Sequence, residues 1–312
     1  MTTSQPTDSF KIMDLKGVIP PIPTPFRNDV IDVAALSSNC ERWMSTGLRG
    51  LVVLGSTGEA PFLDDAESDR VIENVRACIP KERLLIAGVA RESTISTSRA
   101  AIRAAQRGAD AVLVRTPSFF KQFLSDKEFL EYYMDVADSS PVPVILYNFT
   151  GLTGVALSVQ TVSKLSLHPN IVGIKESSSD IGLITSFIDE TSDDFNVLVG
   201  SAPAFYASLV SGAVGGVLAL ACVVPELCVE LLDLVNSERF REARLLQTKL
   251  TPLARLVTRV HGVAGLKAAM TVRGYIGGEP RAPLSVIGEK AMRELKITVE
   301  SVMCDNDNRT KV

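Results

Sequence analysis

Length, composition and charge narrow the classes of protein to which this chain can belong. The 312 residues, 46% of them hydrophobic, are enough for one large domain or two small ones with an ample core. The formal net charge of −4 and the pI near 5.4 argue against a general nucleic-acid binder. No apolar run is long enough to span a bilayer, so we expect neither a nucleic-acid nor a membrane partner.

The N-terminal residues and the cysteines favour a cytoplasmic location. Residues 1–14 lack an apolar signal core and are poor in arginine, and we expect a flexible tail there. The five cysteines form no CxxC pair, and their odd number fits a reducing compartment. Because the chain has only two histidines, a His-based zinc site is disfavoured, and we expect no metal.

Short apolar, β-branched runs recur along the chain, with amphipathic stretches between them. Runs without polar alternation are typical of parallel strands, which are buried on both faces. The first run is the weakest of them, because it contains prolines, which an interior strand rarely tolerates. The eight runs predict strands within residues 17–24, 50–55, 84–89, 111–116, 143–148, 171–176, 196–201 and 215–220.

The segments between the runs predict helices. Residues 32–47 begin at Asp32, a candidate N-cap, and end at a glycine. Residues 64–80 carry an apolar stripe and stop at a proline, and residues 97–110 and 125–140 are amphipathic in the same way. Eight β–α units at a spacing of roughly 20–35 residues favour an α/β fold, a (β/α)8 TIM barrel, over an open doubly wound sheet. We assign residues 15–237 to the barrel. Residues 238–312, where only further helices are predicted, form a C-terminal helical extension.

The C-terminal ends of barrel strands carry the active groups of such folds, which selects Lys175 and Tyr147. Lys175 ends an apolar stretch, and a dry barrel interior disfavours its charged form. The neutral amine is a nucleophile that condenses with a ketone or aldehyde to a Schiff base. Tyr147, with Asn148, stands at the end of the fifth run and is placed to move protons beside the amine. The alternatives are a surface lysine and a core tyrosine with a satisfied hydroxyl.

The stretch GSTGEAP after the second run has the features of an anion site. Small residues such as Gly58 let backbone N–H groups approach a carboxylate, and the hydroxyls of Ser56 and Thr57 add donors. It is not a phosphate P-loop, because no GK[ST] follows, and a tight strand-to-helix turn is the alternative. The ends of the seventh and eighth runs add Gly200 and the backbone near Leu218 as candidate substrate-binding groups.

Together GSTGEAP, YN…TG and VGIKESS at the ends of the second, fifth and sixth runs resemble the dihydrodipicolinate synthase/N-acetylneuraminate lyase family of class I aldolases. The resemblance implies a (β/α)8 barrel, usually a homotetramer, acting on pyruvate or pyruvate-releasing 2-oxo acids. It implies no cofactor beyond the lysine Schiff base with the substrate. By this resemblance Lys175 is the Schiff-base lysine and Tyr147 the proton-shuttling tyrosine. Ser56 and Thr57 bind the pyruvate carboxylate and relay protons.

Two departures from the family pattern bear on the substrate. Synthases that use aspartate semialdehyde carry an arginine in the loop after the tyrosine, where this chain has Leu152. Those synthases and hydroxy-oxoglutarate aldolases also place a tyrosine after the TP of the fourth run, where this chain has Phe119 and Phe120. Other stretches are most similar to 4-hydroxy-2-oxoglutarate aldolase and fungal 2-keto-3-deoxy sugar-acid aldolases. By that similarity Ser177 contacts the distal part of the substrate.

The sequence therefore predicts a pyruvate-forming class I aldolase, a lyase that cleaves a 4-hydroxy-2-oxo acid to pyruvate and an aldehyde. The alternatives are a dihydrodipicolinate synthase-type condensation, a Schiff-base dehydratase or decarboxylase, and an inactive homologue that binds an oxo acid. The family implies a homo-oligomer, a tetramer or a dimer. Phe119, Phe120 and Phe123 fit a subunit contact, with core packing as the alternative.

Overall fold

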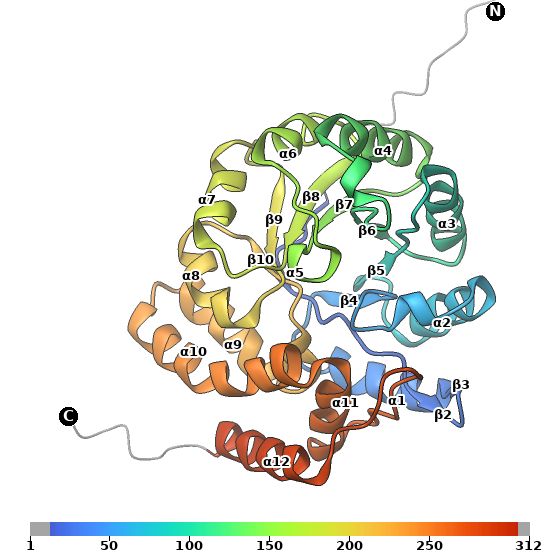
Figure 1. The fold of residues 1–312 in the computed structure, drawn as a ribbon. Coiled ribbons are helices and arrows are strands. Elements are labelled where there is room, and N and C mark those ends of the chain that lie inside the picture. The colour runs from blue at the N-terminus through green and yellow to red at the C-terminus, as the bar shows by residue number, and fades with distance from the viewer. Residues whose placement is uncertain (1–12, 305–312) are drawn as a thin grey trace, which may run out of the picture.

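A computed structural model of the protein describes residues 13–304, so the predicted N-terminal tail lies outside the described residues except for its last two. At its centre is an eight-stranded parallel sheet in the order β1-β10-β9-β8-β7-β6-β5-β4 (Figure 1). Each of the eight predicted runs contains one strand, which confirms the expected parallel architecture. The strands are β1 (Gly17–Val18), β4 (Gly50–Val53), β5 (Leu84–Gly88), β6 (Ala111–Arg115), β7 (Val144–Asn148), β8 (Ile171–Glu176), β9 (Asn196–Val199) and β10 (Gly215–Gly216).

The sheet closes into a barrel where its two edge strands, β1 and β4, meet. Pro21 and Val52 form an isolated parallel bridge. The Ile22 N–H donates to the Val52 carbonyl and the Val52 N–H donates to the Pro20 carbonyl, both at 2.9 Å. The prolines are tolerated in this strand because these bonds need a carbonyl from Pro20 and no N–H from either proline. The same prolines explain why the regular part of β1 is short.

Helices cover the outside of the barrel. Of the four helices whose bounds were predicted, α1, α2 and α4 begin within one residue of the predicted start, and α3 begins three residues earlier. The first helix starts with Asp32 as its N-cap, whose carboxylate accepts from the Ala35 N–H at 3.0 Å. The helices up to the end of the barrel are α1 (Val33–Met44), α2 (Asp65–Cys78), α3 (Thr94–Gln106), α4 (Asp126–Ser139), α5 (Thr150–Thr153), α6 (Val159–Leu165), α7 (Ile181–Asp189), α8 (Phe205–Val210) and α9 (Pro225–Asn236). Among them, α5 is a single turn that directly follows β7, and it was not predicted.

A short hairpin, β2 (Phe26–Arg27) with β3 (Val30–Ile31), was also missed by the sequence analysis. Its two-residue turn, Asn28–Asp29, has φ values of 50° and 63°. Positive φ at both positions is the pattern of the tight hairpin turns that Asn and Asp tolerate. The strands are too short to show an alternating pattern in the sequence.

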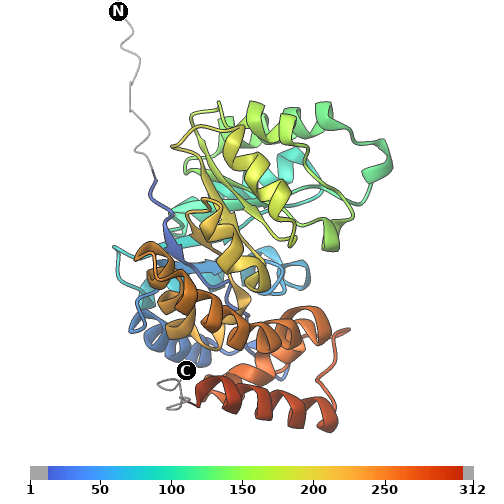
Figure 2. The same cartoon turned by 90° about the vertical axis from the view of Figure 1, so that its left-hand side faces the viewer.

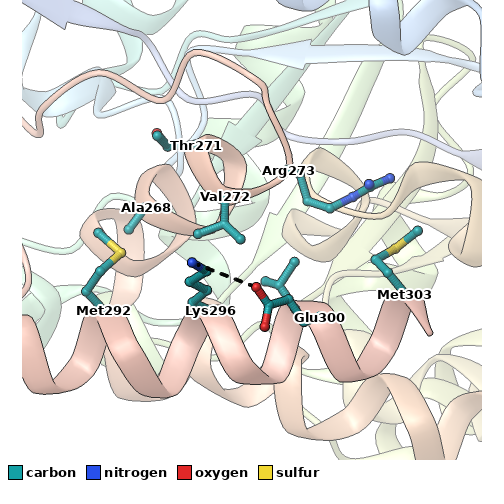
Figure 3. Close-up of a pocket in the computed structure, with 9 residues that line it drawn as sticks. Ala268, Thr271, Val272, Arg273, Met292, Lys296, Glu300 and Met303 are labelled. Atoms are coloured by element: carbon teal, nitrogen blue, oxygen red, sulfur yellow. Dashed lines mark ion pairs between the residues drawn. The ribbon is translucent and has the colours of Figure 1, made fainter.

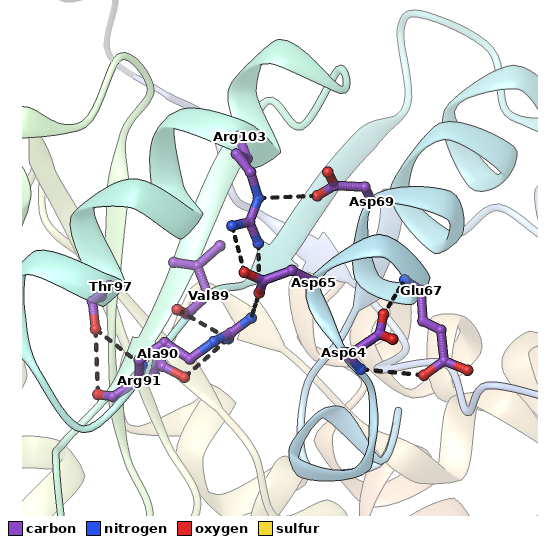
Figure 4. A network of polar contacts seen from close by, with 9 residues as sticks. All are labelled: Asp64, Asp65, Glu67, Asp69, Val89, Ala90, Arg91, Thr97 and Arg103. Carbon is purple, nitrogen blue, oxygen red and sulfur yellow. Dashed lines mark hydrogen bonds and ion pairs between the residues drawn. The ribbon is translucent and has the colours of Figure 1, made fainter.

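A polar network fastens α2 to α3 and to the loop after β5 (Figure 4). Asp65 at the start of α2 accepts from Arg103 at 2.7 Å and from Arg91 at 3.1 Å. The hydrogen bond from Arg103 is the main reason that the pKa of Asp65 lies below its usual value of 3.8. Asp64 caps the same helix in a capping box with Glu67. The network therefore holds the β4–α2 and β5–α3 units of the barrel together.

The C-terminal helices lie together along one side of the barrel (Figures 1 and 2). They are α10 (Phe240–Arg255), which continues into a π-helical turn (Leu256–Val260), α11 (Gly262–Val272) and α12 (Glu289–Met303). Helix α10 packs on α8 and α9, and α11 packs on α12. The boundary at residue 238 stays a prediction. Among residues 13–304, no helix has the length and apolarity to cross a bilayer.

A surface hollow of about 450 Å³ lies between α11 and α12 (Figure 3). Val272 and Met292 line it, together with Lys296 and Glu300, whose charged groups are 4.0 Å apart. None of the candidate catalytic residues lines this hollow. Lys175 and Tyr147 lie instead on the barrel strands β8 and β7.

Candidate active site

Lys175 and Tyr147 lie side by side on adjacent strands and face the inside of the barrel. The two residues are direct register partners across β7 and β8. Tyr147 belongs to the apolar cluster that fills the barrel, together with Ile145 and Leu198, and Leu198 is the register partner of Lys175 on β9. The Lys175 Nζ lies 4.1 Å from the centre of the Tyr147 ring, and the two residues are 4% and 5% exposed. An amine and a phenol thus meet in a nearly dry interior.

An irregularity in β8 sets the direction of the Lys175 side chain. Val144 pairs with Ile171, but the next residue, Ile145, pairs with Gly173, so β8 has one additional residue between these pairs. A shift of one residue moves every following side chain to the opposite face of a sheet. Regular pairing would place Ile174 opposite Tyr147, whereas the bulge places Lys175 there. Gly173 has no space for a side chain, since a Cβ would lie 2.4 Å from the Asn196 carbonyl oxygen.

The next residues of the two strands, Asn148 and Glu176, are fully buried and hydrogen-bonded to each other. The Asn148 Nδ2 donates to Glu176 Oε2 at 2.5 Å, and the Ser178 N–H donates to Oε1 at 2.6 Å. The Leu157 N–H donates to Asn148 Oδ1 at 3.0 Å. Burial raises the pKa of Glu176, and these hydrogen bonds oppose the change. The pair joins β7 to β8 directly beyond Tyr147 and Lys175, and its carboxylate was not singled out from the sequence.

The GSTGEAP turn after β4 lies at the same end of the barrel, because all eight strands are parallel. Ser56 and Thr57 are half-buried in this turn. The Gly58 carbonyl accepts from the buried Thr24 hydroxyl at 2.8 Å, and a Cβ on Gly58 would lie 3.0 Å from the Leu54 nitrogen. The turn is thus held tightly against the barrel, and carboxylate binding by its two hydroxyl side chains stays a prediction.

The remaining candidate residues are Ser177 and Gly200, which lie in contact, and Leu218, whose side chain is buried. The Gly200 N–H donates to the Glu176 carbonyl at 2.6 Å, and a Cβ on Gly200 would meet the Ser177 Oγ. The structure thus brings Ser177 and Gly200 together beside β8. The Leu218 side chain is fully buried in the hydrophobic core, and its carbonyl accepts from Ala221. Substrate contacts of these residues stay predictions.

Two further buried polar features near the strand ends were not predicted from the sequence, an ion pair and a single hydroxyl. Glu59, in the GSTGEAP turn, forms an ion pair with Lys267, and both side chains are 1% exposed. Lys267 shows the same sequence pattern as Lys175, because it lies within an apolar stretch, GLKAAM. Thr116 directly follows β6, and its buried hydroxyl has no hydrogen-bond partner within residues 13–304. In the same range, no cluster of three or more His, Cys, Asp or Glu residues could hold a metal ion.

A closed parallel barrel with a buried lysine beside a tyrosine at its strand ends has the architecture of a class I, Schiff-base-forming lyase. Comparison with known families agrees with this class: residues 14–302 match the model of the dihydrodipicolinate synthetase family. The chain therefore belongs to the dihydrodipicolinate synthetase family. Enzymes of this family are pyruvate-dependent class I lyases and aldolases that use a lysine Schiff base and need no additional cofactor.

Individual relatives cover nearly the whole chain. A 4-hydroxy-tetrahydrodipicolinate synthase of Methanopyrus kandleri is 35% identical over 289 residues, which are 90% of this chain and 96% of that protein. A probable mitochondrial 4-hydroxy-2-oxoglutarate aldolase of Emericella nidulans is 32% identical and covers 82% of this chain and 84% of its own.

Solved structures extend the likeness to three dimensions. A prophage protein of the family from E. coli K12, in complex with pyruvate, has a TM-score of 0.87 at 26% identity, covering 92% of this chain and 98% of its own. A monomeric dihydrodipicolinate synthase variant has a TM-score of 0.89 at 27% identity, covering 95% and 98%. Both relatives thus share the fold over almost the full length of this chain.

Proposed function

We propose that this protein is a class I pyruvate aldolase that cleaves a 4-hydroxy-2-oxo acid, of the 4-hydroxy-2-oxoglutarate or 2-keto-3-deoxy sugar-acid type, to pyruvate and an aldehyde. The observation that carries the proposal is the placement of Lys175 Nζ 4.1 Å from the Tyr147 ring inside the barrel. Membership of the dihydrodipicolinate synthetase family supports the same chemistry.

The proposed mechanism uses four residues. Lys175 attacks the 2-oxo carbon, and Tyr147 assists the loss of water that gives the iminium. Ser56 and Thr57 bind the substrate carboxylate through their hydroxyls. Tyr147, with one of these hydroxyls and a water molecule, removes the proton of the 4-hydroxyl group. The C3–C4 bond breaks, the aldehyde leaves, the enamine takes up a proton, and hydrolysis frees pyruvate.

Two departures from the pattern of the synthases favour cleavage over condensation with aspartate semialdehyde. Leu152 lies on α5, the turn that follows β7, and is 60% exposed, so it offers an apolar side chain where a second carboxylate would need a cation. Phe119 and Phe120 follow β6 and are also exposed, and they carry no hydroxyl to relay a proton. The names of relatives favour condensation instead, because proteins that are 32–35% identical to this chain are called 4-hydroxy-tetrahydrodipicolinate synthase. Condensation is therefore the second candidate.

Borohydride reduction in the presence of pyruvate tests the chemistry. We expect a mass adduct on the peptide that contains Lys175 and no adduct in Lys175→Ala. The exposed Lys164 on α6 provides the matched control, since Lys164→Ala should keep the adduct. An adduct on another residue, or none on the wild type, would refute the mechanism.

A substrate panel then separates the reactions. Release of free pyruvate and an aldehyde from 4-hydroxy-2-oxoglutarate or a 2-keto-3-deoxy sugar acid supports the aldolase. Consumption of pyruvate together with aspartate semialdehyde supports the synthase. Loss of water or carbon dioxide without free pyruvate indicates a dehydratase or decarboxylase. Ligand binding that survives Lys175→Ala, with no turnover, indicates an inactive homologue.

We also propose a homo-oligomer in a reducing compartment, the cytoplasm. Exposed aromatic rings after β6 support a subunit contact, namely Phe119, Phe120 and Phe123. All five cysteines are free, which suits a reducing environment. Relatives differ in both respects, since one is called mitochondrial and another is a monomeric variant.

A further inference from the structure

The GSTGEAP turn, which carries Ser56 and Thr57, ends at a glutamate with an unfavourable backbone conformation. Glu59 has a φ of 58°, in the left-handed region that residues other than glycine adopt at an energetic cost. Its N–H donates to the Ser56 carbonyl at 3.2 Å and closes the turn. Such a conformation persists where surrounding contacts hold it. The contacts of the Glu59 side chain therefore bear on the shape of the turn.

Residues from the C-terminal part of the chain hold that side chain. The Lys267 Nζ on α11 lies 2.5 Å from Glu59 Oε1. The main-chain N–H of Arg281 donates to Glu59 Oε2 at 2.8 Å. Lys267 itself donates to the Glu279 carbonyl at 2.8 Å and lies 4.7 Å from the centre of the Phe26 ring. Both oxygens of the carboxylate are thus bound by residues far from the turn in the sequence.

Stability alone is a weak explanation for this pair. Removing two charges from water costs about as much as their attraction returns, and apolar replacements of buried pairs are often neutral or stabilising. Burial lowers the pKa of Lys267, and the hydrogen bond to Glu59 opposes that change. The ion pair instead fixes the orientation of the turn relative to α11. Because Glu59 directly follows Gly58, this constraint acts next to Ser56 and Thr57.

We propose that Lys267 is a positioning residue of the active site. Through Glu59 it holds the turn so that the hydroxyls of Ser56 and Thr57 face the carboxylate of the 2-oxo acid. This inference rests on the proposed function, in which those hydroxyls bind that carboxylate. It places part of the control of substrate affinity in α11, away from the strand ends. Lys267 touches no reacting atom in this scheme.

The experiment compares three forms of the full-length protein. The double variant Glu59→Gln/Lys267→Met removes both charges, so that no unpaired charge stays buried. The matched control is Arg273→Met, which breaks the ion pair between the end of α11 and Glu226. One readout is the pyruvate concentration that gives half-maximal borohydride trapping on Lys175. The other is amide hydrogen exchange across residues 55–60 without any ligand.

We expect the double variant to need about tenfold more pyruvate, which is the effect of one misplaced charge-assisted hydrogen bond. Trapping at saturating pyruvate should fall less than about threefold, because the lysine and the tyrosine are untouched. Exchange across residues 55–60 should become faster, and Arg273→Met should change neither readout. If this double variant does not fold, Glu59→Gln/Lys267→Gln, which also leaves no unpaired buried charge and keeps an acceptor for the Arg281 N–H, is measured in the same way.

Three outcomes separate this inference from the proposed function. Unchanged half-saturation and exchange in the double variant would overturn the inference and leave the aldolase proposal standing. An equal change in Arg273→Met would also overturn it, because general loosening of α11 would then be the cause. Absence of trapping in the wild type would overturn the proposed function, and the exchange readout would still decide whether the ion pair holds the turn.

Discussion

The Lys175 amine lies 4.1 Å from the centre of the Tyr147 ring, and the two residues are paired in register on adjacent strands. The amine lies over the face of the aromatic ring, while the phenol hydroxyl is the group that can transfer protons. Tyr147 can thus act on Lys175 in two ways, through its ring and through its hydroxyl. A substitution can remove the hydroxyl and keep the ring.

Tyr147→Phe keeps the ring and its burial and removes the hydroxyl. We expect kcat to fall about 100-fold or more, the usual effect of losing a general acid–base group. Borohydride trapping on Lys175 should persist but become slower, since dehydration to the iminium loses its proton donor. Tyr132→Phe is the matched control, because it removes another buried hydroxyl, bonded to Thr97 at 3.0 Å on the outside of the barrel. Unchanged kcat in Tyr147→Phe would contradict the assigned role.

Glu176→Gln tests the buried carboxylate that joins β7 to β8. Its two oxygens accept from Asn148 and from Ser178, whereas a glutamine has one acceptor oxygen. One donor would lose its partner, at a cost of about 1–3 kcal/mol in the free energy of unfolding. Denaturant unfolding at fixed pH measures this loss. A variant as stable as the wild type would show that these hydrogen bonds carry little energy.

The same variant predicts a change in pH dependence. Burial raises the pKa of Glu176 above its usual 4.5, so the folded state keeps this proton to a higher pH than the unfolded chain does. Between 4.5 and the raised pKa, the folded state binds more protons, and the contribution of Glu176 to stability falls as pH rises. The stability difference between wild type and Glu176→Gln should therefore shrink as pH rises from 4.5 to the raised pKa and stay constant above it. A constant difference would mean that the carboxyl titrates alike in both states.

Leu152→Arg tests the substrate assignment. It places a cation on the exposed turn after β7, at the position where the family resemblance implies an arginine in synthases that use aspartate semialdehyde. We expect the KM for aspartate semialdehyde in condensation with pyruvate to fall about tenfold, because the second carboxylate gains a charged partner. Leu152→Gln, which adds polarity without charge, is the control. Efficient condensation by the wild type would refute the premise that this position excludes the substrate.

Phe119→Ser/Phe120→Ser tests the proposed subunit contact. The rings pack edge to face with centres 5.0 Å apart, and Phe119 is 75% exposed. Loss of two exposed aromatic anchors should shift the protein toward smaller species in sedimentation velocity. Leu167→Ser, at another highly exposed apolar residue, should leave the oligomer intact. The same sedimentation coefficient in wild type and double variant would remove these rings from the interface.

Local patterns in the sequence determined much of the barrel. Continuous apolar runs predicted all eight strands, since strands covered on both faces need no polar alternation. The capping side chain of Asp32 predicted the start of α1. Lys175 and Tyr147 could be identified because burying a polar side chain at the end of a strand costs free energy unless the group is paired, neutral or functional. Each of these signals lies within a few residues of the chain.

The tertiary structure decided the features that depend on neighbouring strands and distant segments. Lys175 faces Tyr147 because β8 gains one residue against β7, and that register is set by pairing, with the Asn196 carbonyl excluding any side chain at Gly173. The partner of Glu59 is likewise invisible in the sequence, since Lys267 reaches it only when the C-terminal segment folds back against the turn. Burial, register and long-range pairing are properties of the folded chain.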